Sequence, residues 1–171
     1  ADPIVAWNAI KYFGPYLAEM RLDWDEELRK ALSRASRCKR YDLKPLRLMM
    51  AQIEDAHVHY VEPAASQVRE RFLPLQVRKM ERLIVVTDSK DSSLRKGDIV
   101  RTVDGADATD DFRRCEEMIS EGPHFKAWMA AREWQCRPGQ GRITLEIERE
   151  GRRRTITTHC METPEYAEWL R

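Results

Sequence analysis

The spacing of apolar residues first changes near residue 70 of this chain, and this change constrains the fold more than any other feature. Before residue 70, apolar residues recur at the three- and four-residue spacing of a helix. After it come short runs rich in β-branched residues, separated by turn residues as strands are, and helical spacing then returns. The sequence therefore predicts the fold class α+β, with an N-terminal three-helix segment followed by a β-sandwich or barrel with helices.

Three helices are predicted in the first part of the chain. The first covers residues 3–13 and ends before Pro15, because proline disfavours the helical conformation in the residue that precedes it. The second begins after Asp23, which forms the pattern of a capping box with Glu26. Asp42 is the expected cap of the third helix. The apolar stripe of this third helix consists of Leu43, Leu46, Met49, Met50 and Ile53.

The second part of the chain is predicted to contain strands, two helices and a closing hairpin. The expected elements, in chain order, are strands 72–77, 83–87 and 99–103, helices 111–120 and 124–136, and hairpin strands 143–148 and 155–160. The hairpin turns at Glu150-Gly151, where glycine supplies the backbone freedom of a tight turn.

Composition narrows the class of protein. The chain carries 30 Lys+Arg against 29 Asp+Glu, and 42% of its residues are apolar. This balance excludes a disordered chain and argues against a dedicated nucleic-acid or membrane-surface binder. The four cysteines form no CxxC pair, which argues against a structural zinc site. Two disulfides and four free thiols both remain open, and neither a metal nor another cofactor is predicted.

Two stretches in the second part carry a family resemblance. The run LRKGDIVRTVDG (residues 94–105) resembles the signature of a PDZ domain of the bacterial protease type. The run PGQGRITLEIEREG (residues 138–151) is similar to the hairpin expected downstream of that signature. Because the order of the intervening elements also fits, the resemblance implies a PDZ-like domain over roughly residues 70–160.

The first part resembles the helical N-terminal region of S41-family peptidases, the tail-specific, C-terminal-processing and tricorn-core-like serine proteases. The runs that carry it are WNAIKYFGPY, DWDEELRKAL and LRLMMAQIEDAHVHY. The resemblance implies that a catalytic core follows these two regions and lies outside this chain. The implied organisation is a helical domain over 1–62, a linker over 63–70, a PDZ-like domain over 71–161, and a connection toward the missing core over 162–171.

His57 is the candidate catalytic residue. In the tricorn-like branch of that family a Ser-His pair follows the third N-terminal helix, and the resemblance implies that His57 is the general base for a distant nucleophile. Imidazole suits that role because it titrates near neutral pH. The chain departs from the branch at Ala56, where serine is expected. The alternative is a histidine that caps the helix end, and a metal pair of His57 with His59 is not favoured because further ligands are lacking.

The resemblance also implies a peptide-binding groove, in which a peptide adds as an extra strand between a sheet edge and a helix. By resemblance the receiving strand is 72–77 and the helical wall is 111–120. The loop 69–73 lacks the glycines usual in the family, and Pro74 removes one backbone donor. The candidate peptide-binding residues are Arg71, Phe72, Leu73, Leu75, Val77, Arg78, Phe112, Cys115 and Ile119. The alternative is a degenerate PDZ fold that serves as a spacer.

The resulting functional prediction is the non-catalytic, substrate-recognition portion of an S41-type serine protease, inactive on its own. Its expected partners are a peptide or unfolded protein C-terminus and the catalytic core of the same polypeptide, with no nucleic acid and no membrane span. The resemblance implies an exported protein. The rival prediction is a stand-alone peptide-binding or scaffolding protein. Arg149 and residues 152–154 are interpreted as a solvated hairpin, because glutamates lie among them in the sequence.

Overall fold

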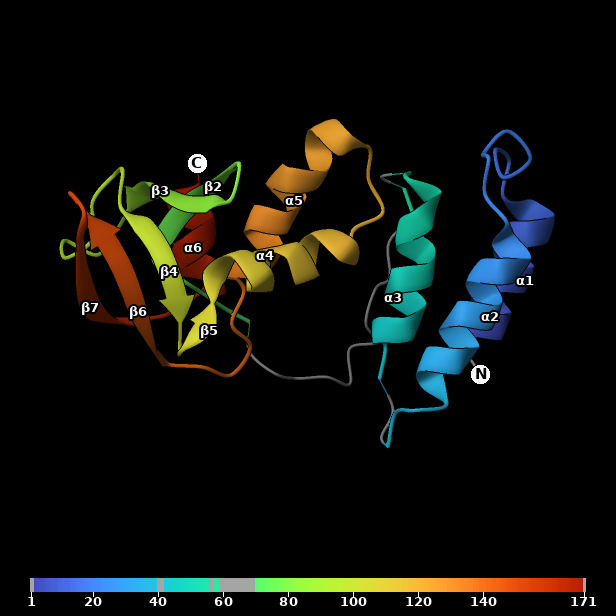
Figure 1. The fold of residues 1–171 in the computed structure, drawn as a ribbon, viewed down its shortest axis with the longest axis horizontal. Helices are drawn as coiled ribbons and strands as arrows, with labels where there is room; N and C mark the ends of the chain where they lie inside the picture. The colour runs from blue at the N-terminus through green and yellow to red at the C-terminus, as the bar shows by residue number, and fades with distance from the viewer. Residues whose placement is uncertain (1, 40–41, 56, 59–69, 171) are drawn as a thin grey trace. The chain divides into compact units, whose positions relative to one another are not determined.

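The computed structural model describes residues 2–39, 42–55, 57–58 and 70–170 (Figure 1). The chain divides into two compact units, a helical unit of residues 1–61 with 117–126, and a sheet unit of residues 62–116 with 127–171. Ala56, His59 and most of the predicted linker 63–70 lie outside the described residues. The helices and the antiparallel sheet confirm the α+β class.

The helical unit contains α1 (Asp2–Phe13), α2 (Trp24–Ala35), α3 (Lys44–Met50) and a short 3-10 helix, η1 (Ala51–Ile53). The predicted cap of α2 is present, since the Asp23 side chain accepts the backbone N–H of Glu26 at 2.9 Å. The Asp42 carboxylate accepts the backbone N–H of Lys44 at 2.8 Å at the start of α3. The third helix is shorter than predicted because its last turn tightens into η1.

The core of the helical unit is built on the α2 and α3 stripes. Its buried members are Trp24, Ala31, Leu46, Met49 and Ile53. Trp24 also donates its indole N–H to the carbonyl of Trp7 at 3.1 Å, so this buried polar group has a partner. The predicted Leu46, Met49 and Ile53 thus fix α3 against its neighbours.

The sheet unit contains a main antiparallel sheet in the order β2 (Leu75–Met80), β3 (Leu83–Ser89), β4 (Ile99–Val103), β6 (Arg142–Arg149) and β7 (Arg152–His159). The short strand β5 (Ala106–Asp107) pairs with β4, and β1 (Arg71–Phe72) pairs with β8 (Met161–Glu162) in a separate two-stranded sheet. Alternate β6 side chains, Ile143, Leu145 and Ile147, are buried, which is the pattern of a strand with one face on the core.

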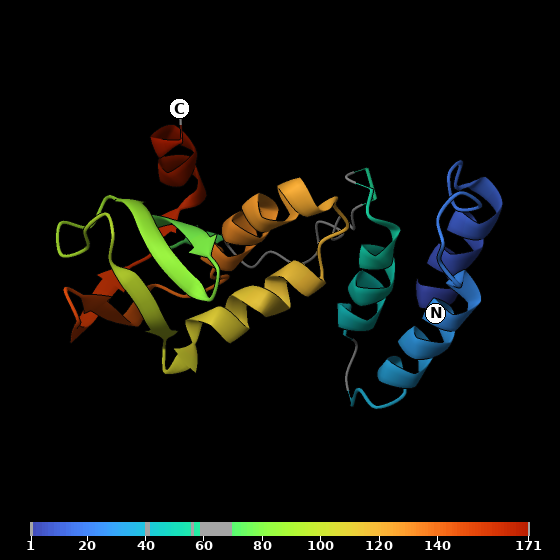
Figure 2. The same ribbon diagram turned by 45° about the horizontal axis from the view of Figure 1, so that its top comes forward.

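Two helices, α4 (Ala108–Glu117) and α5 (Pro123–Gln135), lie beside each other in both ribbon views (Figures 1 and 2). The rings of Phe112 and Trp134, both fully buried, pack between them with centroids 6.2 Å apart. Arg137 follows α5 and donates to Asp111 of α4 at 3.0 Å. Apolar packing and an ion pair therefore hold the two helices to each other.

Two predicted boundaries are wrong. The expected strand 72–77 is interrupted at Leu73-Pro74 and becomes β1 and β2, because proline has no N–H to give to a ladder. The expected helix 111–120 begins and ends three residues earlier, as α4. Its early start follows from Asp107, whose carboxylate accepts the backbone N–H of Asp110 at 2.9 Å.

Residues 163–169, predicted as part of a connection, form the helix α6 (Thr163–Trp169). This helix is held by Tyr166, whose ring stacks on Phe72 with centroids 4.1 Å apart and planes 5° from parallel. The Tyr166 hydroxyl donates to the side chain of Gln135, and both residues are buried. The segment is therefore an integral part of the sheet unit.

Candidate base and peptide-binding edge

His57 lies in a turn that directly follows η1. Glu54 ends η1 in the left-handed conformation, at φ 55°, and turns the chain out of the helix. One oxygen of Asp55, Oδ1, then accepts the backbone N–H of His57 at 2.9 Å and lies 2.8 Å from His57 Nδ1. The carbonyl of Asp55 accepts from the Val58 N–H and from the Ser120 hydroxyl, each at 3.0 Å. Both the side-chain carboxylate and the backbone carbonyl of Asp55 therefore hold this turn in place.

This geometry determines which ring nitrogen of His57 carries the proton. A carboxylate at Nδ1 accepts the proton there, which leaves Nε2 as a proton acceptor. The hydrogen bonds from His57, first from its backbone and then from its ring, lower the pKa of Asp55 and keep it anionic. The side chain of His57 is 95% exposed, so its Nε2 is accessible. Asp55 was not among the predicted site residues, although an Asp two positions before a His is the spacing of such a turn.

The predicted receiving strand lies at an edge of the sheet. Within the described residues β2 pairs with β3 on one side and with no strand on the other. The backbone along that free side is the part of β2 that could receive a peptide strand.

Most of the predicted peptide-binding side chains are in the core. The buried ones are Phe72, Leu73, Leu75, Val77, Phe112 and Ile119. Cys115 is partly buried. Burial keeps most of these side chains away from the surface, and direct contact with a peptide stays a prediction for them.

The two predicted arginines differ in their surroundings. Arg71 donates to Glu162 at 3.4 Å, across the β1–β8 pair. Arg78 is exposed and has no ion pair among the described residues. Arg78 is therefore the one of the two that is free to meet a peptide carboxylate.

An ion pair joins β2 to α4. Lys79 Nζ lies 2.5 Å from Glu116 Oε2 and 5.8 Å from the centre of the Phe112 ring. The Glu116 side chain is 19% exposed, so water screens the pair only in part. A peptide that entered between this strand and helix would have to displace or straddle the Lys79–Glu116 pair.

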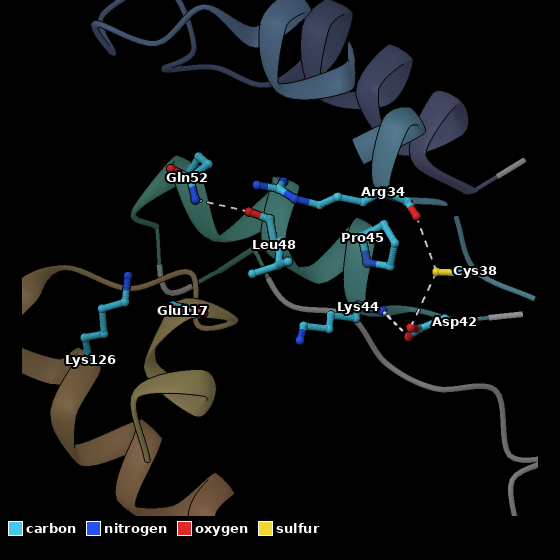
Figure 3. A pocket seen from close by; sticks show the side chains of 9 residues that line it. All are labelled: Arg34, Cys38, Asp42, Lys44, Pro45, Leu48, Gln52, Glu117 and Lys126. Atoms are coloured by element: carbon cyan, nitrogen blue, oxygen red, sulfur yellow. Dashed lines mark hydrogen bonds between the residues drawn. The ribbon is translucent and has the colours of Figure 1, made fainter. Parts of the chain in front are cut away.

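The helical unit contains a cavity of about 660 Å³ that was not predicted (Figure 3). Its lining residues are Arg34, Cys38, Asp42, Lys44, Pro45, Leu48, Gln52, Glu117 and Lys126. Cys38 Sγ lies 3.4 Å from the carbonyl oxygen of Arg34 and 3.8 Å from Asp42 Oδ2. Charges of both signs line this cavity, from three basic and two acidic side chains.

No group of three or more His, Cys, Asp or Glu side chains in the described part of the chain could hold a metal ion. No helix among the described residues is both long and apolar enough to cross a bilayer.

No protein-family model matches the sequence, and no curated protein matches it. Solved structures, however, do match the fold of the chain. The chain aligns with mature CPAF over 99% of its length, at a TM-score of 0.67 and 18% identity. The fold of this chain is a fold found in CPAF. The chain spans 37% of that CPAF chain, and 33% of a serine-to-alanine CPAF mutant that it matches at a TM-score of 0.64 and 19% identity.

A third match is mature CPAF complexed with lactacystin, at a TM-score of 0.65 and 18% identity, again with 99% of this chain covered. CPAF is a chlamydial protease. The chain therefore has the fold of about one third of a protease chain, and the alignment includes both the helical and the sheet unit.

Proposed function

We propose that this chain is the non-catalytic, substrate-recognition portion of an S41-type serine protease, whose sheet unit is a PDZ-like domain. The observation that carries the proposal is the match to CPAF over 99% of the chain and only 37% of the CPAF chain. A fold shared with part of a protease supports a role beside a catalytic core. By the resemblance seen in the sequence, the protein is exported.

In this proposal the free side of β2 binds an extended or C-terminal peptide. Backbone hydrogen bonds supply most of the affinity in this mode, because the peptide becomes a further strand of the sheet. The buried Leu75 and Val77 anchor β2 on the core, and the exposed Arg78 offers a cation on the strand itself. Weak binding follows from the Lys79–Glu116 pair, which a peptide must displace.

His57 is the general base that the chain supplies to the core. The Asp55 carboxylate at 2.8 Å from Nδ1 supports this role, because it orients the ring and leaves Nε2 to accept a proton.

The second candidate function is a stand-alone peptide-binding or scaffolding protein. The Lys79–Glu116 pair between β2 and α4 favours a closed groove, as expected of a degenerate PDZ fold. The two candidates differ in catalysis: the protease portion supplies His57 as a general base, whereas the scaffolding protein catalyses no reaction.

Binding is tested by titrating the labelled chain with a library of free-acid peptides and mapping backbone amide shifts. We expect saturable shifts that concentrate on β2 and α4, and weaker binding for Arg78→Glu with Lys126→Glu as the matched control. Saturable shifts elsewhere, or none, would contradict the proposed groove.

Catalysis is tested in the full-length gene product with a fluorogenic peptide. We expect His57→Gln to abolish turnover while leaving peptide binding unchanged. Full turnover by His57→Gln would remove the general base from the proposal, and a full-length product without any proteolysis would favour the scaffolding protein.

A further inference from the structure

The main sheet has a second free edge, at β7. Within the described residues β7 pairs only with β6, over eight consecutive residue pairs from Arg142↔His159 to Arg149↔Arg152. This ladder shows no register shift, whereas the β2–β3 and β4–β6 ladders each contain one. Bulges and prolines are the usual means of blocking an edge strand, and β7 has neither.

The first half of this edge is strongly basic. Arg152, Arg153 and Arg154 are all exposed, and none of them has an ion pair among the described residues. Arg153 lies opposite Glu148, but Glu148 accepts two hydrogen bonds from Arg101, at 3.1 and 2.8 Å. The positive charge of these three arginines is therefore not neutralised by the neighbouring strand.

The second half of the edge has the opposite character. Thr155, Ile156, Thr157 and Thr158 carry no charge and are all β-branched, the residue class that favours strands. Thr155 and Thr157 are exposed, while Thr158 is buried and donates to Asp91 at 2.6 Å. This half offers backbone pairing, and the arginine half offers charge.

We propose that the β7 edge binds an extended acidic peptide segment, which adds to the sheet as an antiparallel strand. Antiparallel addition continues the pattern of every pair in this sheet and places the C-terminal half of the peptide beside Arg152–Arg154. Carboxylates in that half of the peptide meet the guanidinium groups of these three arginines. The site is separate from β2, since β3, β4 and β6 stand between the two edges.

Arginines on an edge strand also serve to prevent association, so charge alone does not establish binding. The distinguishing property is a requirement for the peptide backbone. A peptide that pairs as a strand needs its own N–H groups along one side, whereas a peptide held by charge alone does not.

The test uses an eight-residue peptide with Thr and Val in its N-terminal half and glutamates in its C-terminal half. Its controls are the same peptide with lysines for glutamates, and the same peptide N-methylated at alternate residues. We expect saturable amide shifts on β7, and about tenfold weaker binding to the chain with Arg152→Gln, Arg153→Gln and Arg154→Gln. An Arg142→Gln variant, altered on β6, is the matched control and retains binding.

Each outcome decides the proposal. Loss of binding by the lysine and N-methylated peptides supports it. Equal binding of the N-methylated peptide, shifts that fall on β2, or no saturable binding would each overturn it. Tighter binding of a single-stranded oligothymidine than of the peptide at these arginines would assign the edge to nucleic acid and overturn it as well. A failure of this proposal does not contradict the proposed groove at β2, because peptide binding there is detected by amide shifts on β2 and α4.

Discussion

Arg149 and Asp98, 51 residues apart in the chain, form a two-pronged ion pair in which Nε and Nη2 each lie 2.7 Å from a carboxylate oxygen. The same guanidinium donates to the carbonyl of Ser93 at 2.8 Å, and the backbone N–H of Arg95 donates to Asp98 at 2.8 Å. Asp98 is only 1% exposed. The pair therefore fastens the turn before β4 to the end of β6.

We expect Arg149→Met to destabilise the protein by about 3 kcal/mol, because it leaves the Asp98 carboxylate buried without its cation. The free energy of unfolding from urea denaturation measures the effect. Arg153→Met is the matched control on the exposed hairpin and should change stability by less than about 0.5 kcal/mol. Equal effects of the two substitutions would show that the Asp98 pair does not hold the turn.

The same pair predicts a dependence on pH. Burial raises the pKa of Asp98, but the hydrogen bonds from Arg149 and from the Arg95 N–H outweigh it and hold the pKa below its ordinary value. A lowered pKa in the folded state contributes stability above the unfolded pKa of about 3.9, which is lost as pH falls through the folded value. We expect stability to fall below about pH 4. Asp98→Asn should reduce that slope in denaturation curves measured between neutral and acidic pH.

The Asp55–His57 contact predicts a tautomer. We expect neutral His57 to carry its proton on Nδ1 in the native chain, because Asp55 accepts it there. Nitrogen-15 chemical shifts of the ring report the tautomer directly. In Asp55→Ala the proton should move to Nε2, the form preferred by a free imidazole, whereas Ser120→Ala should leave it on Nδ1. An unchanged tautomer in Asp55→Ala would remove the positioning role from Asp55.

Tyr166 predicts how α6 is attached. We expect Tyr166→Ala to cost about 3 kcal/mol, because removal of the buried ring leaves a cavity and its stacking on Phe72 is lost. Tyr166→Phe should cost about 1 kcal/mol, because it leaves Gln135 without its hydroxyl partner. Thermal unfolding measures both, with the exposed Tyr16→Ala as the control that changes little. A neutral Tyr166→Ala would mean that α6 does not stabilise the sheet unit.

The cysteines predict an order of reactivity. All four are free thiols, and burial, reinforced by Glu70 and Glu133, raises the pKa of Cys136 to about 11. Cys38 is exposed. Since alkylation proceeds through the thiolate, we expect iodoacetamide to label Cys136 at least about tenfold more slowly than Cys38 at neutral pH. Mass spectrometry of the intact and digested chain resolves the sites, and equal rates would contradict the burial of Cys136.

Local signals were sufficient to predict several elements. The Asp23 cap and the apolar stripe of α3 are encoded within a few residues, and both are present in the structure. The split between β1 and β2 is also encoded locally, in Pro74, because proline has no N–H to give to a strand ladder. The helix α6 was missed because seven residues give too weak a periodicity, and its attachment depends on Phe72, far away in the sequence.

The candidate site, too, was predicted only in part. His57 was predicted by resemblance, but its partner Asp55 became evident only from the turn geometry. The peptide-binding side chains were predicted by resemblance, which assigns a strand and a helix to a groove without showing which of their side chains face the core, and most of them are buried. The Lys79–Glu116 pair joins positions 37 residues apart, and no local pattern encodes such a pair.

The pairing of β1 with β8 has a mechanical consequence. Arg71 lies opposite Glu162 and Phe72 opposite Met161, so the first and last strands of the sheet unit form one two-stranded ladder, and α6 follows directly after it. Tension applied between the two ends of the sheet unit would have to detach Tyr166 of α6 from Phe72 and then open the ladder from its Arg71–Glu162 end, before any load reached the main sheet. We therefore expect α6 and the ladder to give way before the larger sheet.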